Sequence, residues 1–314
     1  MAKALWYGLG SGFLWAVQTV ILSSVLAAGI FAQSPQAVFL APVVGAFLND
    51  AISGIWLFVF RKSYRRFRGS NIILVLKSRH GKWLLLSGLC GGPLGMGAYV
   101  LSISFVRASD TAVISALYPA VGAILGWIFL HEALSWKQVA GTLMSAAGVI
   151  GMIGLPHGSG RHAVYYIPAL ACALFWSLEA VISSYGMKHG TVPFETALQI
   201  RQCTSILCYA AVFLPVLNAW SFTGRILSDR IVIPIILTAL LETGSYLLYY
   251  KSISVTGPSK AMSMNITYII WSILLSIPVF KKLPTVYEAM SIVILAAGVF
   301  MVIRLGRENK PSRL

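Results

Sequence analysis

Three acidic side chains lie inside apolar stretches of this sequence, where a charge is costly. They are Asp50, Glu179 and Glu242. A carboxylate near the centre of a membrane costs about 2.5 to 3.5 kcal/mol on insertion scales, so each of the three should face protein or a water-filled cavity instead of lipid. Buried acids of this kind suit the binding of an organic cation or the carriage of a proton.

Aromatic side chains accompany two of these acids at helical spacing. Trp176 precedes Glu179 by three residues, and Tyr246 and Tyr249 follow Glu242 by four and seven, so each set shares one helical face. An aromatic cage attracts a quaternary ammonium group through the ring quadrupole, by up to about 2 kcal/mol when desolvated, and needs no hydrogen-bond donor from the ligand. A carboxylate beside the rings would supply the counter-charge.

The alternative is that these groups are structural. Tryptophan and tyrosine are common at membrane interfaces and in helix contacts, and Asp50 or Glu242 could pair with a buried base or bind a proton. Arg201, in another apolar stretch, is permanently charged and needs an acidic partner. Glu179, Glu195 and Asp50 are the candidates, and the sequence leaves the choice open.

Membrane-spanning helices must position these residues. Of 314 residues, 58% are hydrophobic and only 11% are charged, with a mean hydropathy of +0.80. Such a chain has too few polar groups to cover a soluble globule of its size. A crossing helix needs about 20 apolar residues. Ten predicted spans follow one another, namely Leu5 to Ile30, Gln36 to Phe60, Trp83 to Phe105, Thr111 to Leu130, Trp136 to Leu155, Ala163 to Met187, Phe194 to Leu217, Ile231 to Ser254, Ser259 to Phe280 and Val286 to Ile303.

The net charge of +15 is concentrated in alternate connections between the spans, above all in the connection from Arg61 to Lys82. Membrane proteins keep basic residues on the cytoplasmic side, so this distribution places both termini in the cytoplasm. It also predicts contact of the basic connection with anionic lipid, and argues against nucleic acid as the partner.

The cysteines and histidines do not have the spacing typical of a metal site or of a catalytic pair. Cys90, Cys172, Cys203 and Cys208 fall in apolar spans without the spacing of metal ligands. The five histidines fall in connections or at span ends, and none pairs with an acid on a predicted helix face. We therefore expect no metal, no cofactor and no enzymatic activity; a membrane-embedded enzyme or accessory subunit is the alternative from another class.

The chain repeats itself. Tyr99 to Val149 aligns without gaps against Tyr249 to Val299, which pairs Tyr118 with Tyr268. Five helices in each half is an odd number, so the halves must enter the membrane from opposite sides. We expect two inverted repeats, 1–155 and 156–314, with the substrate site near the midplane between them.

The pattern around Trp176 and Glu179 recurs in the first span, where Trp15 and Gln18 take the matching places. Trp15 is therefore a further candidate for the site. The glycine-rich stretch Gly88 to Gly97 resembles a phosphate-binding loop only in its glycines. It predicts close helix packing around a break at Pro93.

The stretch from Ser115 to Gly151 resembles the signature end of a repeat in the drug/metabolite transporter superfamily, the EamA-type permeases with ten helices. More narrowly, the chain is similar to LicB-type choline permeases of bacteria. The stretches that carry this similarity are Gly91 to Ala98, Ala173 to Met187, Ala197 to Ser205, Ser245 to Ile253 and Asn265 to Leu274.

This resemblance implies choline uptake through an aromatic box closed by an acidic residue. The positions that match are Trp15, Tyr118, Trp176, Glu179, Tyr246, Asn265, Tyr268 and Trp271. Three positions depart from the expected pattern: Tyr99 replaces a polar amide, Gln18 a small residue and Glu242 a shorter acid. These changes could resize the pocket.

The sequence thus predicts an all-α transporter that imports choline or a related quaternary amine across the bacterial inner membrane by alternating access. The expected substrate-binding residues are Trp15, Tyr118, Trp176, Glu179, Tyr246, Tyr249, Asn265 and Tyr268, and the expected coupling or structural charges are Asp50, Arg201 and Glu242. The alternative function is proton-coupled export of amino acids, nucleobases or cationic drugs.

Overall fold

The computed structural model describes residues 2–26, 29–63, 72–106, 108–153, 163–281 and 283–305. Within these ranges all regular elements are helices, and eight helical segments are long and apolar enough to cross a membrane. Tyr118–Leu130 is a shorter apolar helix. The predicted division of the chain between residues 155 and 156 and part of the basic connection 61–82 lie outside the described residues. The described chain has the build of a multi-pass helical membrane protein.

Six predicted spans correspond to single helices with ends shifted by a few residues. They are α1 (Ala2–Leu26), α2 (Pro35–Ser63), α8 (Trp136–Ile153), α9 (Ile167–Gly190), α13 (Val232–Thr256) and α16 (Val286–Leu305). Short elements connect the long ones. These are η1 (Gly29–Ala32), α3 (Ile72–Lys77), η4 (Ala163–Tyr166), α11 (Leu214–Val216) and α12 (Trp220–Leu227).

Two predicted spans are each broken into two helices. The span from Thr111 to Leu130 contains α6 (Ala108–Ser115) and α7 (Tyr118–Leu130), and the span from Ser259 to Phe280 contains α14 (Pro258–Asn265) and α15 (Tyr268–Phe280). Pro119, in the first turn of α7, has no N–H to continue a ladder from α6. At the second break the Thr267 hydroxyl bonds the Met264 carbonyl and competes with the helical ladder. Both breaks interrupt the backbone inside the bundle.

The helix break that the sequence predicts at Pro93 is wrong. A π-helical turn, η3 (Cys90–Leu94), joins α4 (Arg79–Leu89) to α5 (Gly95–Phe105) without interruption, and the Gly95 N–H donates to the Cys90 carbonyl. The wider turn accommodates a proline that has no N–H. A second π-helical turn, η5 (Tyr209–Phe213), follows α10 (Phe194–Cys208).

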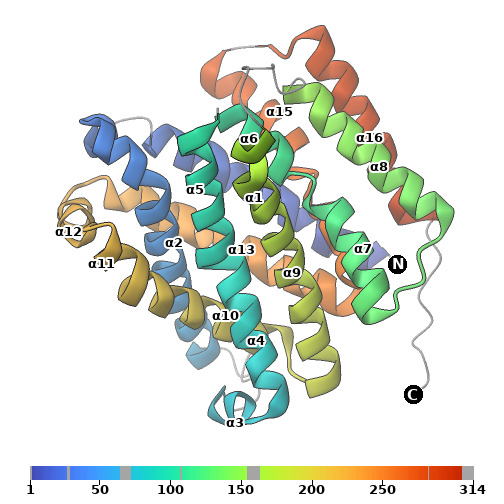
Figure 1. The fold of residues 1–314 in the computed structure, drawn as a ribbon, viewed down its shortest axis with the longest axis horizontal. Helices are drawn as coiled ribbons and strands as arrows, with labels where there is room; N and C mark the ends of the chain where they lie inside the picture. Colours follow the sequence, from blue (N-terminus) through green and yellow to red (C-terminus); the bar gives the residue numbers. More distant parts are fainter. Residues whose placement is uncertain are drawn as a thin grey trace.

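α8 and α16 pack against each other at the edge of the molecule (Figure 1). Small residues let their backbones meet: a Cβ on Gly148 would lie 2.6 Å from the Leu295 nitrogen, and one on Gly298 would lie 2.5 Å from the Ser145 nitrogen. In the interior, α1 packs on α13 and α4 packs on α9. Glu179 belongs to α9 and Glu242 to α13, whereas Asp50 belongs to α2 and Arg201 to α10.

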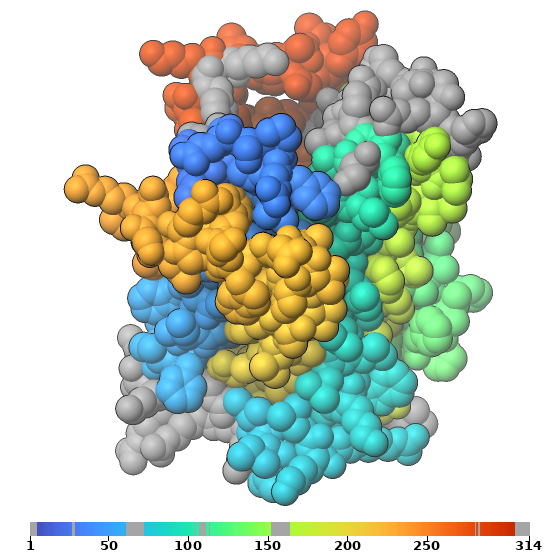
Figure 2. Space-filling view, turned by 60° about the vertical axis from the view of Figure 1, so that its left-hand side comes forward, coloured from blue at the N-terminus to red at the C-terminus, as the bar shows by residue number. Residues whose placement is uncertain are grey.

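α12 is a short helix that the sequence pattern did not predict. Figure 2 shows its part of the chain in gold at the molecular surface. Phe222 packs edge-on against Phe31 of η1, with ring centres 5.8 Å apart, which holds the connection between α11 and α13 against the outer end of the bundle.

Candidate functional site

A cavity of about 390 Å³ lies among the inner helices. All eleven residues expected at the site contribute to its wall. They are Trp15, Asp50, Tyr118, Trp176, Glu179, Arg201, Glu242, Tyr246, Tyr249, Asn265 and Tyr268. The fold therefore brings together groups from distant parts of the chain, and the wall combines aromatic rings with buried charges.

The two broken helices position one side of this cavity. Tyr118 begins α7, Asn265 ends α14 and Tyr268 begins α15. The Tyr118 hydroxyl donates to Asn265 Oδ1 at 3.0 Å, and Asn265 Nδ2 donates to Ser11 Oγ at 3.0 Å. Asn265 and Tyr268, expected on one helix, lie on opposite sides of a break. Such interruptions are typical of sites inside membrane transporters, because they turn backbone ends toward a cavity.

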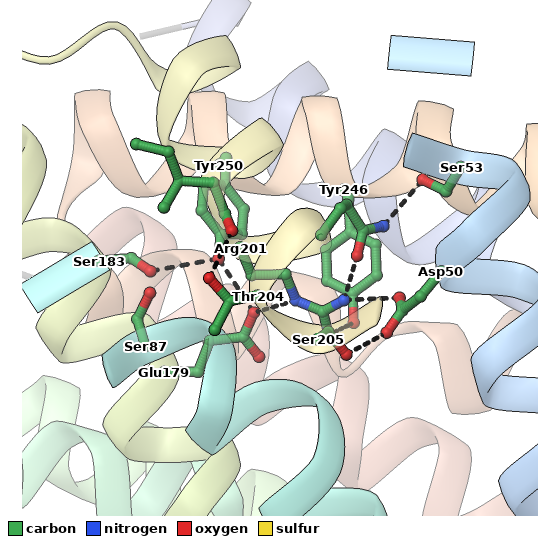
Figure 3. Close-up of polar contacts among 12 residues, drawn as sticks. Asp50, Ser53, Ser87, Glu179, Ser183, Arg201, Thr204, Ser205, Tyr246 and Tyr250 are labelled. Carbon is green, nitrogen blue, oxygen red and sulfur yellow. Dashed lines mark hydrogen bonds and ion pairs between the residues drawn. The ribbon is translucent and has the colours of Figure 1, made fainter. Parts of the chain in front are cut away.

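Arg201 lies between two carboxylates. Its Nε donates to Glu179 Oε1 at 3.0 Å, and its Nη1 donates to Asp50 Oδ1 at 2.6 Å (Figure 3). The side chains of all three residues are at most 6% exposed. The question left open by the sequence is thus answered in favour of both Asp50 and Glu179, whereas Glu195 lies in the first turn of α10.

Further hydrogen bonds hold this ion pair network in one arrangement. Arg201 also donates to the hydroxyl of Tyr246 at 2.8 Å and to the side-chain oxygen of Gln202. Tyr250 donates to Glu179 Oε1 at 3.0 Å, as Figure 3 shows, and Ser205 donates to Asp50. Because the guanidinium donates hydrogen bonds to both carboxylates and to two further side chains, it is held at the cavity wall and cannot move further into the cavity.

Aromatic rings of the cavity wall contact one another in two places: two tyrosine rings lie against Trp176, and Trp15 contacts Tyr246. The Tyr99 ring stacks on Trp176 with centres 6.0 Å apart, and the Tyr118 ring meets it edge-on at 6.3 Å. Trp15 meets Tyr246 edge-on at 5.4 Å. The Arg201 guanidinium lies 4.5 Å from the centre of the Tyr246 ring, so one face of that ring already holds a cation of the protein.

Glu242 stands apart from the ion pairs of Arg201. Its carboxylate is hydrogen-bonded by the amide of Asn49, and Asn49 in turn accepts a hydrogen bond of 3.1 Å from Thr238. Glu242 is 6% exposed and lines the cavity. The site therefore contains three carboxylates and one guanidinium.

Sequence reasoning missed some residues of the site. Tyr250 was not singled out, although its spacing of four residues from Tyr246 places it one turn further along the same face of α13. Tyr209 also lines the cavity, and its place as the first residue of the π-helical turn η5 gave no signal in the sequence. Trp271, matched through the family resemblance, packs edge-on against Phe13 at 5.5 Å and is not among the lining residues.

One glycine in the π-helical turn η3 and one directly after it, at the start of α5, let two site residues approach the backbone. A Cβ on Gly91 would lie 2.0 Å from the Glu179 carboxyl, and a Cβ on Gly95 would lie 2.7 Å from the Trp176 ring. The glycine-rich stretch is thus a close-packing surface, as the sequence indicated, and what it packs against is the carboxylate and the ring of the site.

We expect Gly91→Ala to destabilise the folded protein by about 1 to 3 kcal/mol, because the added methyl group must displace the Glu179 carboxyl. The change is measured as the unfolding temperature of the purified protein. Gly224→Ala is the matched control, since a Cβ there meets no atom within 4 Å. Equal unfolding temperatures of the two variants would contradict the close approach of Glu179 to Gly91.

Known proteins resemble this chain in sequence and in fold. The model of the EamA-like transporter family matches residues 2–154 and 164–304. Protein LicB of Haemophilus influenzae is 32% identical over 229 residues, which are 72% of this chain and 76% of that protein. The aromatic amino acid exporter YddG of Ancylobacter novellus is 26% identical over 113 residues, 35% of this chain and 38% of the exporter. A solved crystal structure aligns with 98% of this chain and 99% of its own, with a TM-score of 0.73 and 18% identity, a likeness of fold.

Proposed function

The chain belongs to the EamA-like transporter family, and we propose that it imports choline or a related quaternary amine across the bacterial inner membrane by alternating access. The observation that carries the proposal is the combination of stacked rings around Trp176 with an excess of buried carboxylates in one cavity. The resemblance of the binding stretches to choline permeases supports the same substrate.

Charge favours a cation in this cavity. Asp50 and Glu179 share the single guanidinium of Arg201, so the ionised network has one more negative charge than positive. Glu242 is a third carboxylate in the same cavity wall. A monovalent cation next to Glu179 would balance the network itself, and Glu242 is then available for a coupling proton. A buried charge that is balanced in this way is far less costly than an isolated one.

The aromatic rings favour a cation without hydrogen-bond donors. Trp15, Tyr118, Trp176, Tyr249 and Tyr268 all line the cavity, and a quaternary ammonium group is held by ring faces alone. Tyr246 has a different part in this proposal, because its ring and hydroxyl already bind Arg201. Asn265 would meet a polar end of the substrate.

We also propose the membrane topology that the sequence predicts: ten crossings, inverted repeats 1–155 and 156–314, and both termini in the cytoplasm. Two features support the repeats. Tyr118 and Tyr268, paired by the internal alignment, each begin a helix after a break. His131 and Lys281, also paired, end those helices in the left-handed conformation, with φ of 50° and 53°.

Export of a planar metabolite is the second candidate function. The parallel stacking of Tyr99 on Trp176 would suit a flat ring, and the similarity to an aromatic amino acid exporter points the same way. This candidate predicts a tryptophan-binding or adenine-binding cavity instead of a choline-binding one.

We expect a thermal-shift titration with choline, betaine, arginine, tryptophan and adenine to show stabilisation by choline, because a ligand that binds only the folded state raises its apparent stability. The shift should require about tenfold more choline or more in Trp176→Ala, since one desolvated ring contributes up to about 2 kcal/mol. Trp271→Ala, which alters a ring outside the cavity lining, is the control. A shift with tryptophan or adenine and none with choline would favour the exporter.

A further inference from the structure

Glu132 is a buried carboxylate remote from the cavity, beyond the far end of α7. It follows His131, the left-handed residue that ends the helix, and is 5% exposed. The Ser259 hydroxyl donates to its Oε2, and the Ser259 backbone N–H forms a second hydrogen bond. Among the described residues, Oε1 has no hydrogen-bond partner. A buried carboxylate oxygen without a partner is unfavourable, which calls for an explanation other than simple packing.

The chain makes room for this carboxylate at two glycines. A Cβ on Gly257 would lie 2.1 Å from Glu132 Oε1, and one on Gly126 would lie 2.7 Å from Oε2. Gly257 has φ of 83° and ψ of 163°, a conformation that is open almost only to glycine. The carboxylate therefore lies against the first turn of α14, where the helix dipole favours a negative charge.

α7 and α14 run antiparallel and are joined at both ends. At the cavity, Tyr118 at the start of α7 donates to Asn265 at the end of α14. Between the two ends, Gly122 allows close packing, since a Cβ there would lie 2.1 Å from Cε of Met262. At the far end, the carboxylate described above joins the end of α7 to the start of α14. We call this contact between the two helices the α7–α14 seam.

The cavity extends away from the seam. On α1 its lining runs from Trp15 to Leu26, the last residue of the helix. Of the described residues of α7 and α14, those that line it are Tyr118 and Asn265, at the cavity ends of the two helices. The other described residues of the seam do not line the cavity, and separation of α7 from α14 would extend the cavity beyond Tyr118 and Asn265.

We propose that Glu132 is the latch of the α7–α14 seam: its hydrogen bonds to Ser259 hold α7 against α14 in the closed state of the transport cycle and break when the two helices separate. Glu132 is thus a positioning residue, which acts through the two helices. Closed gates of this kind are held by a few polar contacts that break when the helices part. The proposal rests on the transporter function but is independent of the substrate. Because Oε1 has no hydrogen-bond partner among the described residues, the contact is weaker than a fully bonded one. The two helices can therefore separate again.

Protonation should strengthen this latch. Burial raises the pKa of the Glu132 carboxyl, against the opposing effects of the Ser259 hydrogen bonds and of Lys188 on α9 and Lys260 on α14. In an open seam the carboxyl meets water and its pKa returns toward 4.5. The closed seam thus binds the proton more tightly than the open one, so closure is favoured as pH falls through the raised pKa and opening is favoured as pH rises above it.

Cysteine labelling tests the latch. Ser263→Cys places a thiol on α14 at a position that is 2% exposed, in full-length protein whose four native cysteines are replaced by alanine. Without substrate, Glu132→Ala should raise the rate of labelling by a water-soluble maleimide about tenfold or more, because the Ser259 hydroxyl and backbone N–H lose their acceptor. Glu132→Gln keeps an acceptor for the Ser259 hydroxyl and should stay within about threefold of the parent.

The pH profile separates a latch from a merely structural residue. Labelling of the parent should rise with pH relative to Ser228→Cys, an exposed site that reports the pH dependence of the reagent, and this rise should vanish in Glu132→Gln. Ser259→Ala removes the hydroxyl that donates to Glu132. It is the test variant to use if Glu132→Ala does not fold. The fold control is Glu288→Ala, which removes the cap of the Thr285 N–H on α16.

Three results would overturn the proposal: unchanged labelling in both Glu132→Ala and Ser259→Ala, an equal increase in Glu288→Ala, or labelling of Glu132→Gln as strong as that of Glu132→Ala. Because no substrate is present, failure to transport choline would not affect this test. Conversely, unchanged labelling in a protein that binds choline would refute the latch alone.

Discussion

For the proposed choline transport, replacement of Glu179 by glutamine is expected to weaken binding of choline about 30-fold or more while the protein stays folded. Glu179 is the acid that lies both in the cavity wall and in the network of Arg201. Removing the charge of one partner from a desolvated charge pair costs about 2 to 5 kcal/mol. Glutamine keeps an oxygen for the hydrogen bonds from Arg201 and Tyr250, and Asp50 still neutralises the guanidinium.

The measurement is a binding titration with choline, followed by calorimetry or thermal shift, beside Glu195→Gln as the control. Glu195 lies in the first turn of α10 and is not among the lining residues, so its neutralisation should leave the affinity within about twofold. Unchanged affinity in Glu179→Gln would mean that the substrate charge is balanced elsewhere, with Glu242 as the next carboxylate to test.

Arg201→Met gives the largest loss of stability, about 3 to 5 kcal/mol, because it leaves Asp50 and Glu179 buried without a counter-charge. For a chain of this size we expect the unfolding temperature to fall by about 10 °C. Arg225→Met is the control, since Arg225 lies on the surface helix α12, where a substitution changes stability by about 0.5 kcal/mol or less.

A second variant separates lost charge balance from lost packing. In Asp50→Asn with Arg201→Met, one of the two uncompensated charges is gone, so much of the stability should return. The unfolding temperatures of the wild type, both single variants and the double variant form the complete cycle. A single Arg201→Met variant as stable as the wild type would contradict an ionised pair, as would a double variant that is less stable than the two single changes added together.

The sequence could reveal which residues are unusual, because membranes penalise charge wherever the fold places it. Asp50, Glu179, Arg201 and Glu242 stand out from their apolar surroundings without any knowledge of contacts. Helical spacing also placed Trp176 beside Glu179, and the internal repeat led to Trp15. All of them line the same cavity.

Local pattern could not reveal the breaks in α6–α7 and α14–α15. Both spans are apolar enough on average to resemble one helix each, and hydropathy carries no information about where the backbone hydrogen-bond ladder stops. Pro93 misled for a similar reason. Proline removes one hydrogen bond, but whether the helix breaks or widens into a π-helical turn depends on what packs there, and here Gly91 and Gly95 let Glu179 and Trp176 approach.

Hydropathy and the cost of buried charge depend on residue type alone, so a helical membrane protein with acids and rings in its interior could be predicted without any contacts, and the transporter family followed from the resemblance. The packing of the helices was needed to show that Arg201 lies between Asp50 and Glu179, that Tyr246 binds the guanidinium, and that Glu132 joins α7 to α14. Each of these contacts joins residues distant in the chain. Which of several chemically similar partners each residue contacts depends on how the helices pack.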